Sequence, residues 1–295
     1  LAVSGEIKNC FAGAPAARLR ASAPSIDAEE VIGCVTELRK LIKSFEDDDE
    51  EDGRERRRED RANLLNATVD ADVNVGRFTY RSLAVSDLQA SSRLSGGNVL
   101  LESLRGIMGD GAFSASGSIA REGEGLDCAC RITGTRLQLA PILKAIAPQR
   151  TEEVSGIADM ALTMQGSGAT SDAFQKNLTG EGNFTVRDGR ISGLKSLESV
   201  ASLVKIDALK TLSFDESRGT FTIHDGAVHL DSSLKGKEVE LYPVGTIGLD
   251  SALDLALDMR LAPQVSDQIA DGVLTKYFKD PQGWTLLSLA IKAPP

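Results

Sequence analysis

Aromatic residues are few in this chain, and it has neither an excess of positive charge nor a long apolar run; each of these shortages excludes a class of protein. Aromatic residues make up 4% of the 295 residues, with a single Trp, so any apolar surface has to be aliphatic. The net charge of −10 argues against a nucleic-acid-binding protein, because binding to phosphates needs clustered Lys and Arg. It also argues against electrostatic docking on anionic lipid headgroups. No apolar run reaches the ~18 residues of a membrane-spanning helix, so we do not expect this segment to cross a bilayer.

Cysteine provides neither a metal site nor a disulfide framework. Cys10, Cys34, Cys128 and Cys130 lack the paired C-x-x-C spacing of a zinc site. Cys128 and Cys130 lie two residues apart on an expected strand, so they share a face and we interpret them as small apolar packing residues. A Cys10–Cys34 disulfide is the alternative in an oxidising compartment. The chain begins at Leu1 rather than at Met, and we treat it as a piece of a longer protein.

Two ten-residue segments near the middle of the chain are near-copies of each other. Gly182-Asn-Phe-Thr-Val-Arg-Asp-Gly-Arg-Ile191 returns as Gly219-Thr-Phe-Thr-Ile-His-Asp-Gly-Ala-Val228. In each copy an Asp-Gly pair separates two short apolar stretches, which is typical of a β-hairpin with a type I′ turn. We therefore predict structural turns at two pairs of residues: Asp188 with Gly189, and Asp225 with Gly226.

The two predicted turns also fix which residues should face each other. In the first hairpin, Val186 should face Ile191. In the second, Ile223 should face Val228 and Phe221 should face Leu230 on an apolar face, while Thr222 should face His229 on a polar face. The segregation of one apolar and one polar face is what sets the register of a sheet.

Strict alternation of apolar and polar residues extends this pattern over much of the chain. It is clearest in Leu65–Val75, Leu126–Ile132 and Leu253–Leu261, and it is typical of antiparallel strands with one buried face. Short segments at helical spacing, such as Ala140–Ile146, interrupt it. The fold class is therefore predicted to be mostly β: an elongated, curved antiparallel sheet of hairpin repeats with a few short amphipathic helices.

The first part of the chain has a different character. We expect a partial strand at 17–23, then an amphipathic helix over 28–45 that is capped by Ser25 or Asp27. Residues 46–61 form a charged run that cannot bury surface, so we interpret it as solvated. The predicted domains are therefore residues 1–62, containing the partial strand, the helix and the charged linker, and residues 63–295, containing the sheet.

No arrangement of residues in the sequence predicts a catalytic site, a metal site or a cofactor. His224 and His229 lie within one predicted hairpin, and Gly166-Ser-Gly168 and Gly180-Glu-Gly182 lack the Lys-Ser/Thr that completes a phosphate-binding loop. No serine has the setting of a nucleophile elbow. We therefore expect a protein that is not an enzyme.

The segment Gly180–Gly193, together with Gly219–Leu230, Gly245–Leu249 and Leu253–Leu261, resembles the C-terminal region of AsmA-like proteins. The resemblance covers about residues 64–291 and extends in architecture to TamB and to chorein-type bridge-like lipid transfer proteins. It implies a taco-shaped sheet whose apolar groove holds lipid, located in the periplasm of a Gram-negative bacterium and attached to the inner membrane through an anchor outside this segment. It also implies phospholipid transport toward the outer membrane and outer-membrane assembly proteins as partners.

The resulting hypothesis is a non-enzymatic protein whose apolar groove binds phospholipid acyl chains. The alternative is a structural or adhesive β-repeat scaffold with a dry core that binds protein partners. We call the period-two aliphatic residues and the two hairpin Phe residues the groove candidates. They are Val69, Val73, Val75, Leu126, Ile132, Phe184, Val186, Ile191, Phe221, Ile223, Val228, Leu230, Leu253, Leu255, Leu257 and Met259.

Overall fold

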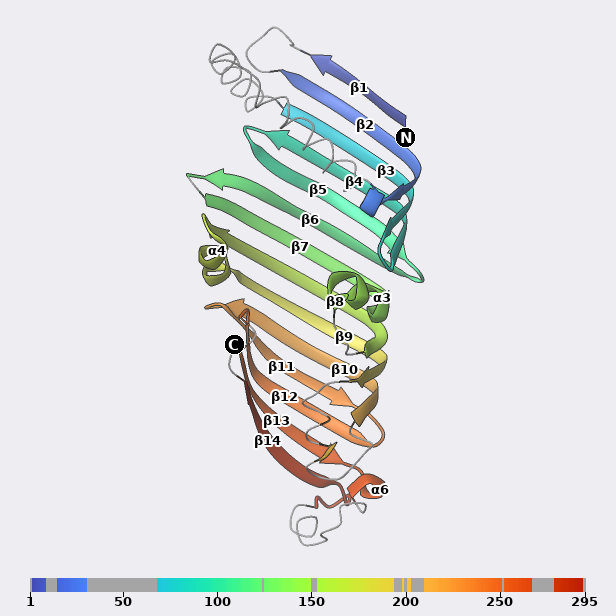
Figure 1. Ribbon diagram of the computed structural model, residues 1–295, viewed down its shortest axis with the longest axis vertical. Coiled ribbons are helices and arrows are strands. Elements are labelled where there is room, and N and C mark those ends of the chain that lie inside the picture. The colour runs from blue at the N-terminus through green and yellow to red at the C-terminus, as the bar shows by residue number, and fades with distance from the viewer. Residues whose placement is uncertain are drawn as a thin grey trace. The chain divides into compact units, whose positions relative to one another are not determined.

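The computed structural model (Figure 1) describes residues 2–8, 15–30, 68–123, 125–149, 153–193, 198, 201–202, 210–250, 252–266 and 279–293. These residues form a 14-stranded sheet in which the strands pair in chain order from β1 to β14. This confirms the predicted mostly-β class. Because each strand pairs with its neighbours in sequence, the chain needs few long connections.

The chain divides into two compact units, Leu1–Cys130 and Arg131–Pro295, which we call unit 1 and unit 2. Unit 1 contains β1 (Ala2–Lys8), β2 (Ala16–Asp27), β3 (Thr68–Tyr80), β4 (Leu83–Ser95), β5 (Asn98–Met108) and β6 (Gly111–Glu122). The boundary falls within β7 (Gly125–Gln138). Unit 2 contains β8 (Glu153–Gly168), β9 (Thr179–Ser192), β10 (Thr211–His224), β11 (Ala227–Lys235), β12 (Val239–Gly248), β13 (Leu253–Leu261) and β14 (Thr285–Ala293). The predicted boundary between residues 62 and 63 lies outside the described residues and stays a prediction.

One strand pair departs from the expected antiparallel order. β2 and β3 pair in parallel, with Ala21 opposite Val73 and Ile26 opposite Phe78. A parallel pair needs a crossover connection of about a dozen residues or more, and the segment from residue 28 to 67 is long enough to supply it. The predicted strand at 17–23 is part of β2. Residues 28–30 are helical and Asp27 accepts a 2.9 Å hydrogen bond from the Glu29 N–H, whereas the rest of the predicted helix and the charged run at 46–61 lie outside the described residues.

The predicted turn at Asp225-Gly226 is confirmed. Both residues have positive φ, 54° and 71°, as a type I′ turn requires. The register of β10 on β11 is also the predicted one: Ile223 faces Val228, Phe221 faces Leu230 and Thr222 faces His229.

The predicted turn at Asp188-Gly189 is wrong. Both residues lie inside β9, which runs without interruption from Thr179 to Ser192. Asp188 has a φ of 51°, but Gly189 is not among the residues with positive φ, so only half of the type I′ requirement is met. Gly189 faces Phe214 of β10, and Ile191 faces Leu212 of β10 instead of Val186. Asp188 therefore makes an irregularity within a strand, opposite a register shift in β8 between Ser155 and Ile157.

The same irregularity recurs in other long strands and keeps one face apolar. Asp87 in β4 and Arg136 in β7 also have positive φ, 51° and 53°. Each shifts the alternation of the strand by one residue. Next to Arg136, for example, Gly134 and Leu137 are both buried although they are three residues apart.

The described helices of unit 2 are short. α3 (Leu139–Ile146), which the sequence predicts, and α4 (Ser171–Asn177) both contact β8, and α6 (Pro263–Ser266) follows β13. Thr170 caps α4 by accepting a hydrogen bond of 3.2 Å from the Ala173 N–H. The strands of unit 2 bend along their length (Figure 1).

Candidate functional site

In unit 2, one face of the sheet carries rows of apolar side chains that cross from strand to strand. One row follows directly paired residues from β8 to β14: Leu162, Gly182, Phe221, Leu230, Gly245, Leu255 and Ile291. A parallel row contains Ala158, Val186, Ser217, Leu234, Leu241, Met259 and Leu287. Directly paired residues point to the same side of a sheet, so these rows form one surface, the unit 2 apolar face.

Unit 1 is built in the same way. One of its rows, from β1 to β6, contains Val3, Ala21, Val73, Ala90, Leu104 and Ala115. A second row contains Leu94 of β4, Val99 of β5 and Ile119 of β6. We call this surface the unit 1 apolar face. Its rows contain no charged side chain.

Glycine opposite phenylalanine is a recurrent device on both apolar faces. Phe113 faces Gly106, Phe184 faces Gly219, Phe221 faces Gly182 and Phe214 faces Gly189. In each pair, a Cβ placed on the glycine would meet atoms of the phenylalanine ring at 3.0 Å or less. The rings therefore lie across the space above the glycines. The repeated Gly-x-Phe motif is explained by this geometry, because two copies on neighbouring antiparallel strands cover each other's glycine.

The two apolar faces differ in how far they are covered. On the unit 1 face, Val3 is 64% exposed, Ile119 is 46% exposed and Leu126 is 49% exposed. The only helical residues that the structure describes in unit 1 are 28–30. On the unit 2 face, a buried cluster includes Leu212, Phe214, Leu241, Met259 and Leu261, with Val265 of α6 and Ala201 packed into it. Part of the unit 2 face is therefore a closed core. The unit 1 face is buried at Val75 and Val85 but exposes large apolar side chains elsewhere over the described residues.

The structure places every groove candidate on one of these two faces. Val69, Val73, Val75 and Leu126 belong to unit 1, and the others, from Ile132 to Met259, belong to unit 2. Of these, Val75, Val186, Ile223, Leu257 and Met259 are buried and so contribute to packing. The sequence analysis missed the exposed Val3, Ile7, Leu94, Val99 and Ile119. For Leu94, Val99 and Ile119, the available signal was the alternation of apolar and polar residues over short stretches between Gly-containing turns, such as Gly96-Gly97 and Gly109.

The opposite face of unit 1 carries ion pairs that run across neighbouring strands. Asp70 of β3 receives a 2.7 Å hydrogen bond from Arg93 of β4, and Arg18 of β2 lies 3.7 Å from the same carboxylate. The hydrogen bond from Arg93 holds the pKa of Asp70 below its ordinary value. Arg93 in turn lies 3.8 Å from Glu102 of β5. This face is built to remain in water, in contrast to the apolar face on its other side.

Unit 2 has a similar polar face with a partly buried network. Arg260 donates hydrogen bonds of 2.6 Å to both Glu240 and Asp280, and its guanidinium lies 5.2 Å from the centre of the Trp284 ring. The hydrogen bond from Arg260 lowers the pKa of Asp280. Desolvation and a hydrogen bond to Glu240 raise the pKa of Tyr242. The network ties the turn before β14 to β12 and β13.

Other chemistry is sparse in the part of the chain that the structure describes. His224 and His229 stack on the polar face with ring centres 3.9 Å apart, and His224 Nδ1 lies 2.9 Å from the Asp225 carboxylate. No group of three or more His, Cys, Asp or Glu side chains in the described ranges is arranged to hold a metal ion. Cys128 and Cys130 are free thiols on β7, and burial raises the pKa of Cys130. None of the described helices has the length and apolarity needed to span a membrane.

Comparison with known proteins gives a family. No curated protein and no solved structure matches the chain. A family model described as the AsmA family, which is associated with the bacterial cell envelope, matches residues 43–232. The match covers more than half of the chain and includes β3 to β10 and most of β11, which carry the central part of the rows and the glycine–phenylalanine pairs described above. The chain therefore belongs to the AsmA family.

Proposed function

We propose that this protein binds phospholipid acyl chains on its apolar sheet faces and thereby contributes to phospholipid transport from the inner to the outer membrane and to outer-membrane biogenesis. The observation that carries the proposal is the unit 1 apolar face. Its rows are apolar from strand to strand, and Val99 and Ile119, which face each other, are 39% and 46% exposed. An exposed, continuous apolar surface of this kind marks a binding surface in a soluble protein.

The physical match is between a row of side chains and an acyl chain. Leaving one CH₂ group in water costs about 0.8 kcal/mol, so a carrier of acyl chains needs apolar contact that continues over many groups. Neighbouring strands lie about 4.8 Å apart, so a row that crosses the sheet offers contact at each strand. On the unit 1 face the ring of Phe113 lies over Gly106 and adds to this apolar surface. The charged opposite face stays hydrated.

Family membership supports the setting of this function. We propose a periplasmic location in a Gram-negative bacterium, attachment to the inner membrane through an anchor outside this segment, and outer-membrane assembly proteins as partners. No catalytic step is part of the proposal.

The test compares two substitutions on adjacent residues of β5 that point to opposite faces. Val99→Asp places a charge on the unit 1 apolar face, and Leu100→Asp places the same charge on the polar face, where Leu100 is 43% exposed and faces Arg93 and Ser118. Each protein is purified without detergent and examined by native mass spectrometry and lipid extraction. We expect the unchanged protein and L100D to retain phospholipid, and V99D to lose most of it.

Equal retention by V99D and L100D would show that lipid does not bind to the unit 1 face. A lipid-free unchanged protein that also binds no hydrophobic dye would instead favour a structural scaffold with a dry core. The buried cluster of unit 2 is the observation that supports that second function.

A further inference from the structure

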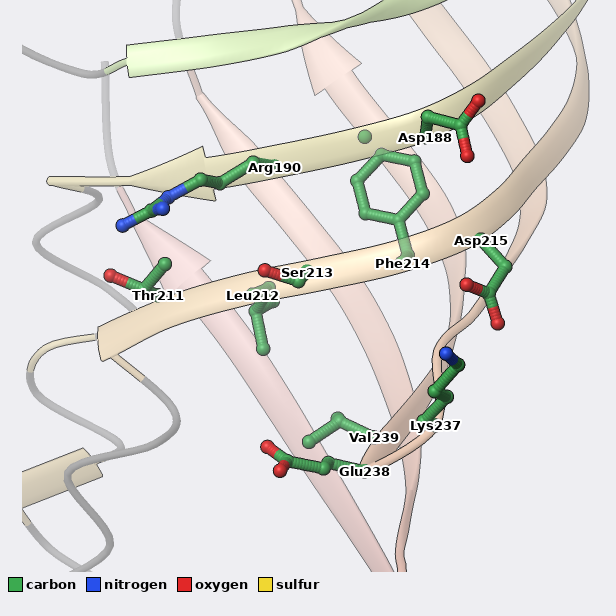
Figure 2. A pocket seen from close by; sticks show the side chains of 11 residues that line it. Asp188, Arg190, Thr211, Leu212, Ser213, Phe214, Asp215, Lys237, Glu238 and Val239 are labelled. Carbon is green, nitrogen blue, oxygen red and sulfur yellow. The ribbon is translucent and has the colours of Figure 1, made fainter.

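A pocket of about 530 Å³ lies in unit 2 where β9 and β10 approach the turn between β11 and β12 (Figure 2). Its floor is apolar: Leu212, Phe214 and Val239 line it and also belong to the buried cluster of the unit 2 apolar face. Its rim is charged and exposed, with Asp188, Arg190, Asp215, Lys237 and Glu238. Charges of both signs therefore surround the end of an apolar surface.

The irregularity in β9 creates this arrangement. The positive φ of Asp188 shifts the alternation of the strand, so that Val186 and Gly189 are both buried and the exposed Asp188 carboxylate lies at the step between them. Gly189 leaves room for the ring of Phe214, which it faces across the strand pair. The dipeptide Asp188-Gly189 thus supplies one acidic group of the rim and the space for the floor.

The Asp188 carboxylate and the Arg190 guanidinium lie at opposite ends of the pocket. Figure 2 shows Asp188 and Asp215 at one end and the Arg190 guanidinium and the Thr211 hydroxyl at the other, with Phe214 and Leu212 between them. Lys237 points toward Asp215 from the turn below, and Glu238 lies beneath Leu212. Among the described residues, the Arg190 side chain has no ion-pair or hydrogen-bond partner, so the end of the pocket that holds its guanidinium is available to a ligand.

We infer that this pocket binds a zwitterionic phospholipid headgroup that carries a phosphate and an amine. The inference rests on the proposed function, since the acyl chains would lie beyond the pocket on the half-buried part of the unit 2 apolar face, which includes Leu230 and Leu255. Arg190 and Thr211 bind the phosphate oxygens, because a guanidinium and a hydroxyl are donors suited to them. Asp188 accepts the ammonium group at the other end. The three acids outnumber the two cations on the rim, so a headgroup with net negative charge binds less well than a zwitterion.

The experiment measures which phospholipid the protein selects. The full chain, purified without detergent, is incubated with vesicles containing equal amounts of phosphatidylethanolamine and phosphatidylglycerol with the same acyl chains, and is then separated from them. The bound lipids are quantified by mass spectrometry. We expect the unchanged protein to enrich phosphatidylethanolamine, and Asp188→Asn to reduce that enrichment about threefold, the size expected for one exposed charge pair, without changing the total bound lipid.

The choice of asparagine keeps the fold, because Asn is one of the few residues that tolerate positive φ. Asp231→Asn, which removes the same charge from an exposed position on β11 outside the pocket, is the matched control and should leave the enrichment unchanged. Arg190→Gln should lower the bound amount of both phospholipids, because both carry a phosphate.

The outcomes separate the two proposals. Lipid bound in the ratio of the vesicles by the unchanged protein would overturn the headgroup site while leaving acyl-chain binding intact. No bound lipid at all would overturn both. Soluble glycerophosphoethanolamine should fail to displace the bound lipid, because it has no acyl chains to bury. Displacement by it at a comparable concentration would mean that the pocket binds a small phosphorylated amine rather than a lipid.

Discussion

The pairing of Gly189 with Phe214 can be tested as a coupling between two residues. A Cβ placed at Gly189 would meet ring atoms of Phe214, and its three nearest neighbours all belong to the outer part of that ring. Phe214 is 6% exposed and packs in the buried cluster, so the ring has little room to move away. Gly189→Ala should therefore overpack this site.

The expected magnitudes follow from the two opposing effects of the added methyl group. Alanine in place of glycine within a strand gains about 0.5–1 kcal/mol from reduced chain entropy. Overpacking of a well-packed site costs about 1–3 kcal/mol. Gly189→Ala alone should thus destabilise unit 2 by at most about 2.5 kcal/mol, with the difference of the two effects spanning roughly 0–2.5 kcal/mol. Phe214→Leu removes the outer ring atoms and itself costs stability through the cavity that it leaves, a cost that the double-mutant cycle subtracts.

In the Phe214→Leu background, the methyl group at 189 no longer meets a ring, so only the entropic gain remains. The coupling energy between the two substitutions should then equal the overpacking cost, about 1–3 kcal/mol. Urea unfolding followed by fluorescence measures it, because the single Trp, Trp284, lies in unit 2. An equal loss of stability from Gly189→Ala in both backgrounds would refute the reasoning, because the ring would then not be what excludes the methyl group.

Two further predictions concern the turn and the polar network of unit 2. Gly226→Val should destabilise the β10–β11 hairpin by about 1–2 kcal/mol, because the φ of 71° at this position disfavours a β-branched residue. No atom lies within 4 Å of the new Cβ, so the cost comes from the backbone alone. Gly226→Asn should be tolerated, and equal urea midpoints for the two variants would contradict this prediction. The lowered pKa of Asp280 means that the folded state favours its charged carboxylate. The stability that Asp280 contributes is therefore fully present above the ordinary pKa of 3.8, and it is lost as the pH falls through the lowered pKa of the folded state. The unfolding midpoint of the unchanged protein, followed at Trp284, should therefore decline on acidification below about pH 4 more steeply than that of Asp280→Asn, and parallel pH profiles would contradict the assignment.

The alternation of apolar and polar residues predicted the strands and the face to which their side chains point. In Leu253–Leu261, for example, the structure has the strand β13 with Leu257, Met259 and Leu261 buried on one side. This works because a two-residue period allows only two faces, and the chain buries the apolar one. Which part of an apolar face is closed and which is open was not predictable. Closure depends on contacts such as those of Ala201 and Val265 with the cluster, which come from outside the strands.

The parallel pairing of β2 with β3 was also hidden from the sequence. Strand direction depends on where the connecting segment leads, and residues 28–67 are long enough for either a crossover or a return on the same side. The alternation of β2 and β3 looks the same in both arrangements, since parallel and antiparallel partners share a face in the same way. Local pattern therefore determines the faces of a strand but not its direction.

The two Asp-Gly pairs show how a partner strand overrides a local turn signal. A turn at Asp188 would have folded Ile191 back onto Val186 and removed the last residues of β9 from both neighbouring strands. In the structure those residues pair with β8 on one side and with β10 on the other, with Val154 and Leu212 both facing Ile191. The continuous strand also allows Phe214 to cover Gly189, in register with the reciprocal Gly182–Phe221 and Phe184–Gly219 pairs. At Asp225 the following strand β11 returns along β10, so the turn and the pairing favour the same structure. The Asp-Gly signal therefore predicts a turn only where the next segment has no better partner. At Asp188-Gly189, where the prediction fails, the two residues line the proposed headgroup pocket.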